Sequence, residues 1–282
     1  MSKTQVEHID QVALTRRADA SANVYLFGGT LTSWKLKEHE VLFLSKDAIF
    51  NNKKAIRGGI PLVFPHFGPW GEGRPQHGFA RTSLWKLSGQ NKDRKSGDVS
   101  ATFTMEDSEE TRKIWNYSFK LTYTVTLKAK SLLLEFTVDN KGQEAFDFTC
   151  LLHTYLGVDD ITQTSVVGLQ GTKYDDKVTG QTDCTEENEE VTISGETDRI
   201  YKSTPNELTV KNTKGGKSVI IKKNNFPDAV VWNPWIEKAK AMSDFGDDEY
   251  LVMLCVEAGF VAKPFHLEPS ETFQASQELS LA

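Results

Sequence analysis

The chain has 282 residues, of which 33 are lysine or arginine and 39 are aspartate or glutamate, so its net charge is −6. A chain of this length can bury a large core, and all-β domains of this size are often single units. The acidic balance disfavours general binding to nucleic acid or anionic membranes. We therefore expect one domain spanning residues 1–282, with neither of these as a partner and with any bound anion held by a local basic cluster.

The N-terminal segment and the cysteines favour a cytoplasmic protein. Residues 1–10 are polar and lack the apolar core of a signal peptide. No stretch approaches the roughly 20 apolar residues of a membrane helix. The cysteines, at positions 150, 184 and 255, are odd in number, widely spaced and without a CxxC pair. This pattern fits a reducing compartment better than a disulfide framework or a zinc site, and we expect neither metal nor cofactor.

Alternation of apolar and polar residues dominates the first half of the chain and predicts half-buried strands. It is clearest in the segments 99–105, 119–128 and 132–138. The short gap between the last two segments predicts a hairpin.

The second half of the chain carries weaker signals. Gly215-Gly216 predicts a hairpin between residues 208–211 and 219–222. The apolar run 251–256 is typical of a strand covered on both faces. A short helix is predicted after Pro234, over residues 235–243. The acidic segment 177–190 predicts a solvated loop. Together these elements predict an all-β fold, a large antiparallel β-sandwich with few short helices.

Residues 57–81 read RGGIPLVFPHFGPWGEGRPQHGFAR and hold six glycines and four prolines. Glycine and proline fix an irregular backbone path, and loops of this kind commonly carry function. Arg57 and Arg81, at its two ends, could form an anion clamp, or each could pair with a surface carboxylate. Gln76 and His77 both offer hydrogen-bond donors and acceptors to sugar hydroxyls.

Two further residues are candidates for acid–base chemistry. His153 follows an apolar run in FDFTCLLHTYLGV and is either a core histidine or a positioned acid/base. Glu257 ends the run LVMLCV, where burial would raise its pKa and suit it as a general base. Asp198 could form an ion pair with Arg199. The tryptophans of VVWNPW could line a sugar pocket or pack at a sandwich edge.

Taken together, the motifs RGGIPLVFPHFG, QHGFAR, LLHTYL, TDRIY, VVWNPW and CVEAG, in that order, resemble the hexose-6-phosphate mutarotases. These enzymes, also called glucose-6-phosphate 1-epimerases, are a branch of the aldose 1-epimerase family. The resemblance covers nearly the whole chain. It implies a galactose-mutarotase-like β-sandwich that acts on a hexose 6-phosphate, and we expect a monomer.

The resemblance also implies roles for individual residues. The family's catalytic histidine and glutamate fall on His153 and Glu257. Its sugar-phosphate contacts fall on Arg57, Gln76, Arg81 and Asp198, and His77 matches a histidine that lies near the sugar in related mutarotases. In the implied mechanism, Glu257 takes the proton of the C1 hydroxyl while protonated His153 donates to the ring oxygen; the ring opens, C1 rotates and the ring recloses.

Two other functions fit parts of the sequence. A mutarotase for unphosphorylated aldoses would share the histidine and glutamate segments, but the arginine pair argues against it. A non-catalytic carbohydrate-binding protein would need neither His153 nor Glu257 and would favour exposed aromatic residues.

Overall fold

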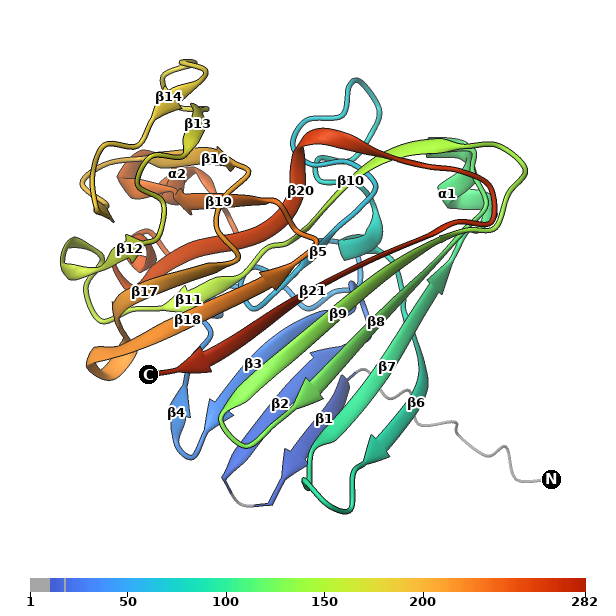
Figure 1. Cartoon of the computed structure of the whole chain (residues 1–282), viewed down its shortest axis with the longest axis horizontal. Coiled ribbons are helices and arrows are strands. Elements are labelled where there is room, and N and C mark those ends of the chain that lie inside the picture. Colours follow the sequence, from blue (N-terminus) through green and yellow to red (C-terminus); the bar gives the residue numbers. More distant parts are fainter. Residues whose placement is uncertain (1–10, 18) are drawn as a thin grey trace.

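The computed structural model describes residues 11–17 and 19–282, whose strands form three antiparallel sheets (Figure 1). The predicted all-β architecture is therefore confirmed. Residues 1–10, the basis for expecting no signal peptide, lie outside the described residues. Along the described part of the chain, no helix combines the length and apolar character that crossing a membrane would need.

The nine-stranded sheet forms one layer of the sandwich, and its long strands run side by side across Figure 1. Its strands, in spatial order, are β15 (Glu190–Thr192), β12 (Ser165–Val167), β17 (Glu207–Thr213), β18 (Lys217–Asn224), β21 (Thr272–Leu281), β9 (Ser131–Asn140), β8 (Phe119–Leu127), β7 (Val99–Glu106) and β6 (Lys86–Lys92).

The eight-stranded sheet forms the second layer. Its strands, in spatial order, are β14 (Cys184–Thr185), β13 (Lys173–Asp176), β16 (Thr197–Lys202), β19 (Asp228–Asn233), β20 (Met253–Leu267), β10 (Phe146–Leu152) and β5 (Leu62–Val63), while β11 (Tyr155–Gly157) also pairs with β20.

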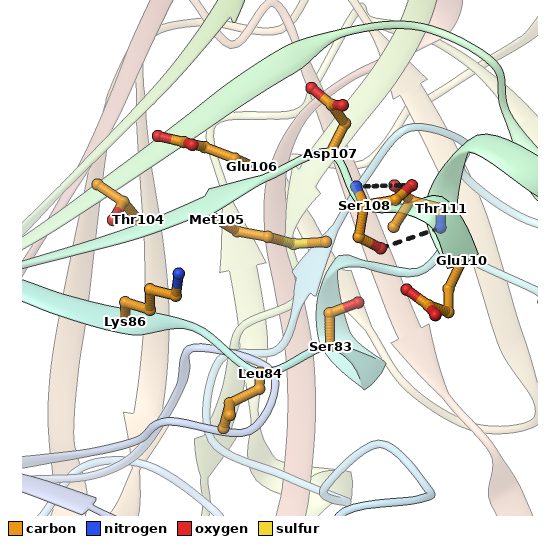
Figure 2. A pocket seen from close by; sticks show the side chains of 10 residues that line it. All are labelled: Ser83, Leu84, Lys86, Thr104, Met105, Glu106, Asp107, Ser108, Glu110 and Thr111. Carbon is orange, nitrogen blue, oxygen red and sulfur yellow. Dashed lines mark hydrogen bonds between the residues drawn. The ribbon is translucent and has the colours of Figure 1, made fainter.

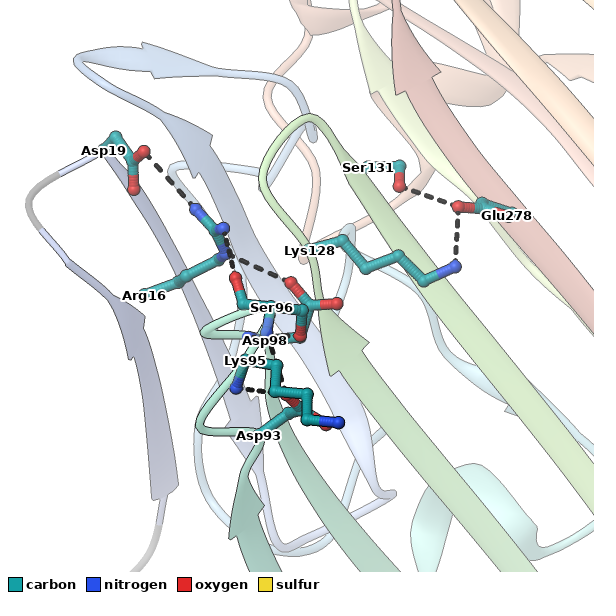
Figure 3. A network of polar contacts seen from close by, with 9 residues as sticks. All are labelled: Arg16, Asp19, Asp93, Lys95, Ser96, Asp98, Lys128, Ser131 and Glu278. Atoms are coloured by element: carbon teal, nitrogen blue, oxygen red, sulfur yellow. Dashed lines mark hydrogen bonds and ion pairs between the residues drawn. The ribbon is translucent and has the colours of Figure 1, made fainter.

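A smaller sheet contains the first strands of the chain. It consists of β1 (Gln11–Arg16), β2 (Ala20–Tyr25), β3 (Thr30–Leu36) and β4 (His39–Glu40). Its contacts with the nine-stranded sheet are to β7 and β8. Buried Arg16 strengthens this junction, because its guanidinium donates to the Asp98 carboxylate at 3.2 Å and to the Ser96 carbonyl at 2.8 Å (Figure 3).

Helices are few and short. The described residues contain the α-helices α1 (Glu109–Ile114) and α2 (Trp235–Ala241) and the 3₁₀ turns η1 (Ala80–Thr82), η2 (Ile161–Gln163), η3 (Lys214–Gly216) and η4 (Glu249–Val252). The helix predicted over 235–243 is therefore confirmed, with its end two residues earlier.

The predicted strands and hairpins are largely confirmed. β8 and β9 pair as a hairpin, as do β17 and β18 on either side of Gly215-Gly216. The strand predicted over 251–256 is wrong for its first two residues, since Leu251 and Val252 lie in η4 and are exposed. The predicted loop 177–190 contains the short strand β14 followed by buried Glu186, which accepts a hydrogen bond from Tyr201.

The main core lies between the two large sheets, and strand alternation builds it. Leu132, Leu134, Phe136 and Val138 of β9 are buried in the same cluster as Val256 of β20. Each fully buried side chain of this kind contributes roughly 1.5–3 kcal/mol. Because alternate residues of a strand point to opposite faces, the neighbours of Val256 face away from this core. The opposite face of the eight-stranded sheet is therefore free to carry chemistry.

Candidate active site

Strand register brings the candidate residues to one face of the eight-stranded sheet. Glu257 of β20 stands opposite Val230 of β19, and Cys255 stands opposite Trp232. In the next pair of strands, Trp232 stands opposite Asp198 of β16. Directly opposed residues share a face, so Asp198 and Glu257 belong to the same surface. Strand pairing and side-chain alternation thus place two residues about sixty positions apart in the sequence on the same face of the sheet.

The glycine- and proline-rich segment folds over this surface. At Gly78 the backbone has a φ of 69°, and an added Cβ would lie 2.1 Å from the carbonyl oxygen of Phe64. Only glycine fits such a close approach. The tight path returns the chain so that Gln76, His77 and Arg81 lie over the same cavity as Arg57. Gly78 thus allows the backbone path that places the candidate residues of this segment over the cavity.

All seven residues named from the sequence line one cavity of about 340 Å³. They are Arg57, Gln76, His77, Arg81, His153, Asp198 and Glu257. The cavity is large enough for a compound of the size of a sugar phosphate, since ligand sites typically measure about 300–1,000 Å³.

His153 and Glu257 form a buried pair in this cavity. Nδ1 of His153 lies 3.3 Å from Oε1 of Glu257, and the two residues are 7 % and 1 % exposed. No described residue forms a hydrogen bond of good geometry with His153 Nδ1 or with either Glu257 oxygen. A buried carboxylate without a partner costs free energy, so this pair is not explained by stability.

Burial sets the protonation of the pair. Loss of solvent lowers the pKa of His153 well below its usual value, and the proximity of His77 and of two arginine charges adds to this effect. Burial raises the pKa of Glu257 well above its usual value. Both shifts favour a neutral imidazole beside a protonated carboxyl. The sequence analysis expected the proton on His153, as an imidazolium, whereas the pKa directions favour the same proton on Glu257.

Arg57 is already held by the protein. Its Nε and Nη2 atoms each donate to a carboxylate oxygen of Asp244 at 3.3 Å, and Nη1 donates to the hydroxyl of Tyr155 at 3.3 Å. Although burial opposes the charge, Tyr155 and Asp244 together raise the pKa of Arg57. The alternative of a carboxylate partner is therefore correct for Arg57, but the partner is a buried residue that fixes the guanidinium at the cavity wall.

Arg81 lacks such a partner. Its Nη2 donates to the carbonyl of Gln76 at 2.9 Å, and its buried Nε has no hydrogen-bond partner among the described residues. Burial, together with the charge of Arg57, lowers the pKa of Arg81 to about 10. A half-buried guanidinium with an unpaired buried Nε favours an anionic ligand.

His77 lines the same cavity, with its ring centroid 5.9 Å from that of His153. Its backbone has a φ of 64°, and its Nδ1 accepts a hydrogen bond from the Gly68 amide at 3.1 Å, which leaves the ring proton on Nε2. Burial and the two arginine charges lower the pKa of His77 to about 3, so the ring is neutral. Gln76 is exposed at the rim of the cavity. Both side chains can offer neutral hydrogen bonds to a ligand.

Asp198 does not pair with Arg199, because neighbouring strand residues point to opposite faces. Arg199 instead forms ion pairs with Asp176 and Glu186. Asp198 lines the cavity, where burial raises its pKa against the opposing effect of two lysines. Of the two tryptophans in VVWNPW, Trp232 lines the cavity, whereas Trp235 begins α2 and packs on Tyr250.

Several cavity residues escaped the sequence reasoning. Lys177 and Lys238 line the cavity, and Asp244 and Tyr155 anchor Arg57. Tyr155 carried a usable signal, since it stands two residues after His153 in the motif LLHTYL. Asp244 carried none, because it meets Arg57 across 187 residues of sequence.

A second hollow of about 450 Å³ lies near α1 (Figure 2). Its lining contains the carboxylates of Glu106, Asp107 and Glu110 but no histidine. Its polar groups are used locally, because Ser108 and Thr111 exchange hydrogen bonds at the start of α1 and Asp107 accepts from Arg112. We interpret this hollow as a by-product of helix capping.

One group within the described residues has the side chains of a metal site. Ligand atoms of His153, Cys255 and Glu257 lie within 4.8 Å of one another. Burial, reinforced by Glu257, raises the pKa of the Cys255 thiol well above its usual value. A thiol held in its protonated form is a poor metal ligand. We therefore interpret the group as an acid/base pair beside a core thiol.

Comparisons with known proteins show what the chain as a whole is similar to. The family model described as aldose 1-epimerase matches residues 10–280. A protein of Cenchrus ciliaris is 38% identical over 279 residues, covering 96% of this chain and 84% of its own. A protein of Escherichia coli K12 is 33% identical over 281 residues, covering 96% and 92%. Both carry the name "Putative glucose-6-phosphate 1-epimerase".

Solved structures share the architecture. The crystal structure of a "putative mutarotase" from Salmonella typhimurium superposes with a TM-score of 0.88 at 30% identity, covering 96% of this chain and 90% of that one. A galactose mutarotase related enzyme from Lactobacillus acidophilus gives a TM-score of 0.77 at 16% identity, covering 96% and 97%. The latter similarity concerns the fold alone and confirms the galactose-mutarotase-like β-sandwich.

Proposed function

Because the chain belongs to the aldose 1-epimerase family, we propose that it interconverts the α and β anomers of hexose 6-phosphates, chiefly glucose 6-phosphate. The observation that carries the proposal is the His153–Glu257 pair, which has no hydrogen-bond partner among the described residues and lies in one cavity with Arg81, whose buried Nε also has none. The relatives' names indicate the substrate class. The cavity contains groups suited to the ring, the phosphate and the hydroxyls of such a substrate.

The acid–base pair opens the sugar ring. A cyclic hexose is a hemiacetal, so inversion at C1 requires cleavage of the bond between C1 and the ring oxygen. Glu257 as carboxylate takes the proton of the C1 hydroxyl while His153 as imidazolium donates to the ring oxygen. Rotation about C1–C2 exposes the other face of the aldehyde, and the two residues reverse roles. Each general acid or base contributes about 10²–10⁴-fold.

The pair needs one proton in total, and the pKa directions fit this need. With the proton on Glu257, its transfer across the 3.3 Å gap to Nδ1 generates the imidazolium and carboxylate together. No proton has to enter or leave the cavity. Burial thus favours an uncharged pair that can form the imidazolium and the carboxylate by one proton transfer.

The arginines hold the 6-phosphate. Arg81 has a free buried Nε, and Arg57 is fixed at the cavity wall by Asp244 and Tyr155. Guanidinium groups bind phosphate oxygens through paired hydrogen bonds. Binding energy at this remote group helps to place C1 between acid and base. Gln76, His77 and Asp198 orient the sugar hydroxyls.

We further propose that the enzyme works as a monomer in the cytoplasm. The whole set of site residues comes from one chain, so no second subunit is required to complete the cavity. The cysteines are all free, as expected in a reducing compartment. Light scattering of the purified protein and fractionation of cells test these two points.

The test of the function is anomer exchange measured by saturation-transfer NMR. We expect the protein to accelerate α/β exchange of glucose 6-phosphate well above the uncatalysed rate, and to act more weakly on glucose. Galactose and mannose 6-phosphates, measured in parallel, rank the substrates. Equal kcat/KM for glucose and glucose 6-phosphate would favour a mutarotase of unphosphorylated aldoses. Calorimetric binding without exchange would favour a carbohydrate-binding protein.

A further inference from the structure

We infer that Tyr155 is a positioning residue that couples the anion site to the acid–base pair. Its hydroxyl holds the guanidinium of Arg57, and its ring lies flat against the imidazole of His153. This inference rests on the proposed function and adds to it a residue that touches neither the phosphate nor C1.

The ring of Tyr155 fixes the orientation of His153. The two ring centroids are 4.7 Å apart, and the planes differ by 12°. Trp232 meets both rings edge-on, at 6.0 Å from each. The imidazole therefore has aromatic walls on two sides, which restricts its rotation about the side-chain bonds. A restricted imidazole keeps Nδ1 facing Glu257.

The hydroxyl of Tyr155 fixes Arg57. It accepts the hydrogen bond from Nη1 at 3.3 Å, while Asp244 accepts from the other side of the guanidinium. Burial raises the pKa of Tyr155, so the phenol stays neutral beside the arginine. With both neighbours in place, the remaining N–H groups of Arg57 keep one direction, and little ordering is left for a bound phosphate to impose.

The body of Tyr155 is itself immobile. The residue is 2 % exposed, its amide donates to the Gly59 carbonyl at 2.9 Å, and its carbonyl accepts from the Phe43 amide at 3.0 Å. It also stands opposite Cys255 in the pairing of β11 with β20. One rigid side chain thus sets the positions of a phosphate-binding residue and a catalytic residue relative to each other.

The chain offers a matched control in Tyr201. This residue is 0 % exposed, and its hydroxyl also accepts from an arginine, Arg199 Nη1, at 3.4 Å. It belongs to the core between the two large sheets and is absent from the cavity lining. Removing either hydroxyl leaves one arginine contact unmade; Tyr201→Phe also removes the hydrogen bond that this hydroxyl donates to Glu186 at 2.8 Å, so it is the more severe loss of buried hydrogen bonds, away from the cavity.

Kinetics of three variants test the inference. Tyr155→Phe keeps the ring and removes the hydroxyl. KM for glucose 6-phosphate should rise about tenfold, as expected for a lost hydrogen bond to a charged group. The kcat and the KM for glucose should stay nearly unchanged. Tyr155→Leu removes the ring, so kcat should fall about tenfold on both sugars. Tyr201→Phe should change neither constant. An equal rise of KM on both sugars, or the same loss in Tyr201→Phe, would overturn the inference.

A binding measurement separates this inference from the proposed function. Titration with inorganic phosphate, followed by the NMR shifts of the His153 ring, should show saturable changes in the wild type. Tyr155→Phe should weaken phosphate binding about tenfold and diminish the response of the ring, whereas Tyr201→Phe should retain both. This pattern would stand even if the protein exchanged no anomers. An unchanged titration in Tyr155→Phe would refute the coupling, whatever the activity.

Discussion

The two faces of the eight-stranded sheet carry groups of similar composition that use their hydrogen bonds differently. On the core face, buried Glu186 lies beside Tyr201 and Arg199. Its Oε2 accepts from the Tyr201 hydroxyl at 2.8 Å, and its Oε1 accepts from the backbone and side chain of Asn188 at 3.1 and 2.8 Å. Oε2 also accepts from Arg199 Nη1 at 3.4 Å, so the protein supplies four donors to this carboxylate, as stability requires.

On the cavity face, Glu257 lies at similar depth but has no such donors. Nδ1 of His153 lies 3.3 Å from its Oε1, yet neither this ring nor the arginines of the cavity form a hydrogen bond of good geometry with it. The contrast separates two uses of a buried carboxylate. Where the fold supplies donors, the group holds the structure together. Where the fold provides no donors, the buried carboxylate is a candidate for exchanging a proton with a substrate.

The largest effect should follow from Glu257→Gln, which removes the base without changing the shape of the side chain. We expect the exchange rate to fall by about 10²–10⁴-fold, the usual contribution of one general base, while the free energy of unfolding changes by less than about 1 kcal/mol. His153→Ala should lose activity to a similar extent. Saturation-transfer NMR and urea unfolding measure the two quantities. Wild-type exchange rates in both folded variants would refute the mechanism.

A smaller effect should follow from Arg81→Ala, because this guanidinium has free donors in the cavity. We expect KM for glucose 6-phosphate to rise about 10- to 100-fold, corresponding to one or two hydrogen bonds between charged groups, with a much smaller change for glucose. Arg74, exposed at the tip of the same segment, supplies the control variant Arg74→Ala. If Arg81→Ala weakened both sugars equally, Arg81 would not be a phosphate ligand.

The sequence could predict the strands and could single out His153 and Glu257 as candidates, but not which residues surround and support them. Alternation is a local pattern, so β8 and β9 could be recognised without the rest of the chain. His153 and Glu257 were recognisable because their surrounding motifs resemble a family. Asp244 was not, because an ion pair between distant loops leaves no periodic trace, and the burial of Glu186 depends on strand pairings that no local pattern encodes.

The core-face carboxylate should respond in the opposite way. Glu186→Gln keeps an acceptor for some donors but leaves Arg199 and the Asn188 amide with poorer partners. We expect the free energy of unfolding to fall by about 1–3 kcal/mol, the usual cost of unsatisfied buried polar groups, while the exchange rate stays within about twofold of the wild type. Urea unfolding and exchange NMR on the same samples decide. A loss of activity without a loss of stability would contradict the contrast drawn between the two faces.

The smallest effect concerns pH, and it tests the single shared proton directly. Burial lowers the pKa of His153 from its usual 6.5 and raises that of Glu257, and both shifts favour a pair that holds one proton. A second proton, which would abolish the base, enters only at a pH below the usual histidine value. We therefore expect kcat at saturating glucose 6-phosphate to change by less than about twofold between pH 7.5 and pH 6, after subtraction of the uncatalysed rate at each pH. If kcat instead fell to half its maximum near pH 6.5, His153 would titrate like a solvated histidine. Burial of the pair would then not control its protonation.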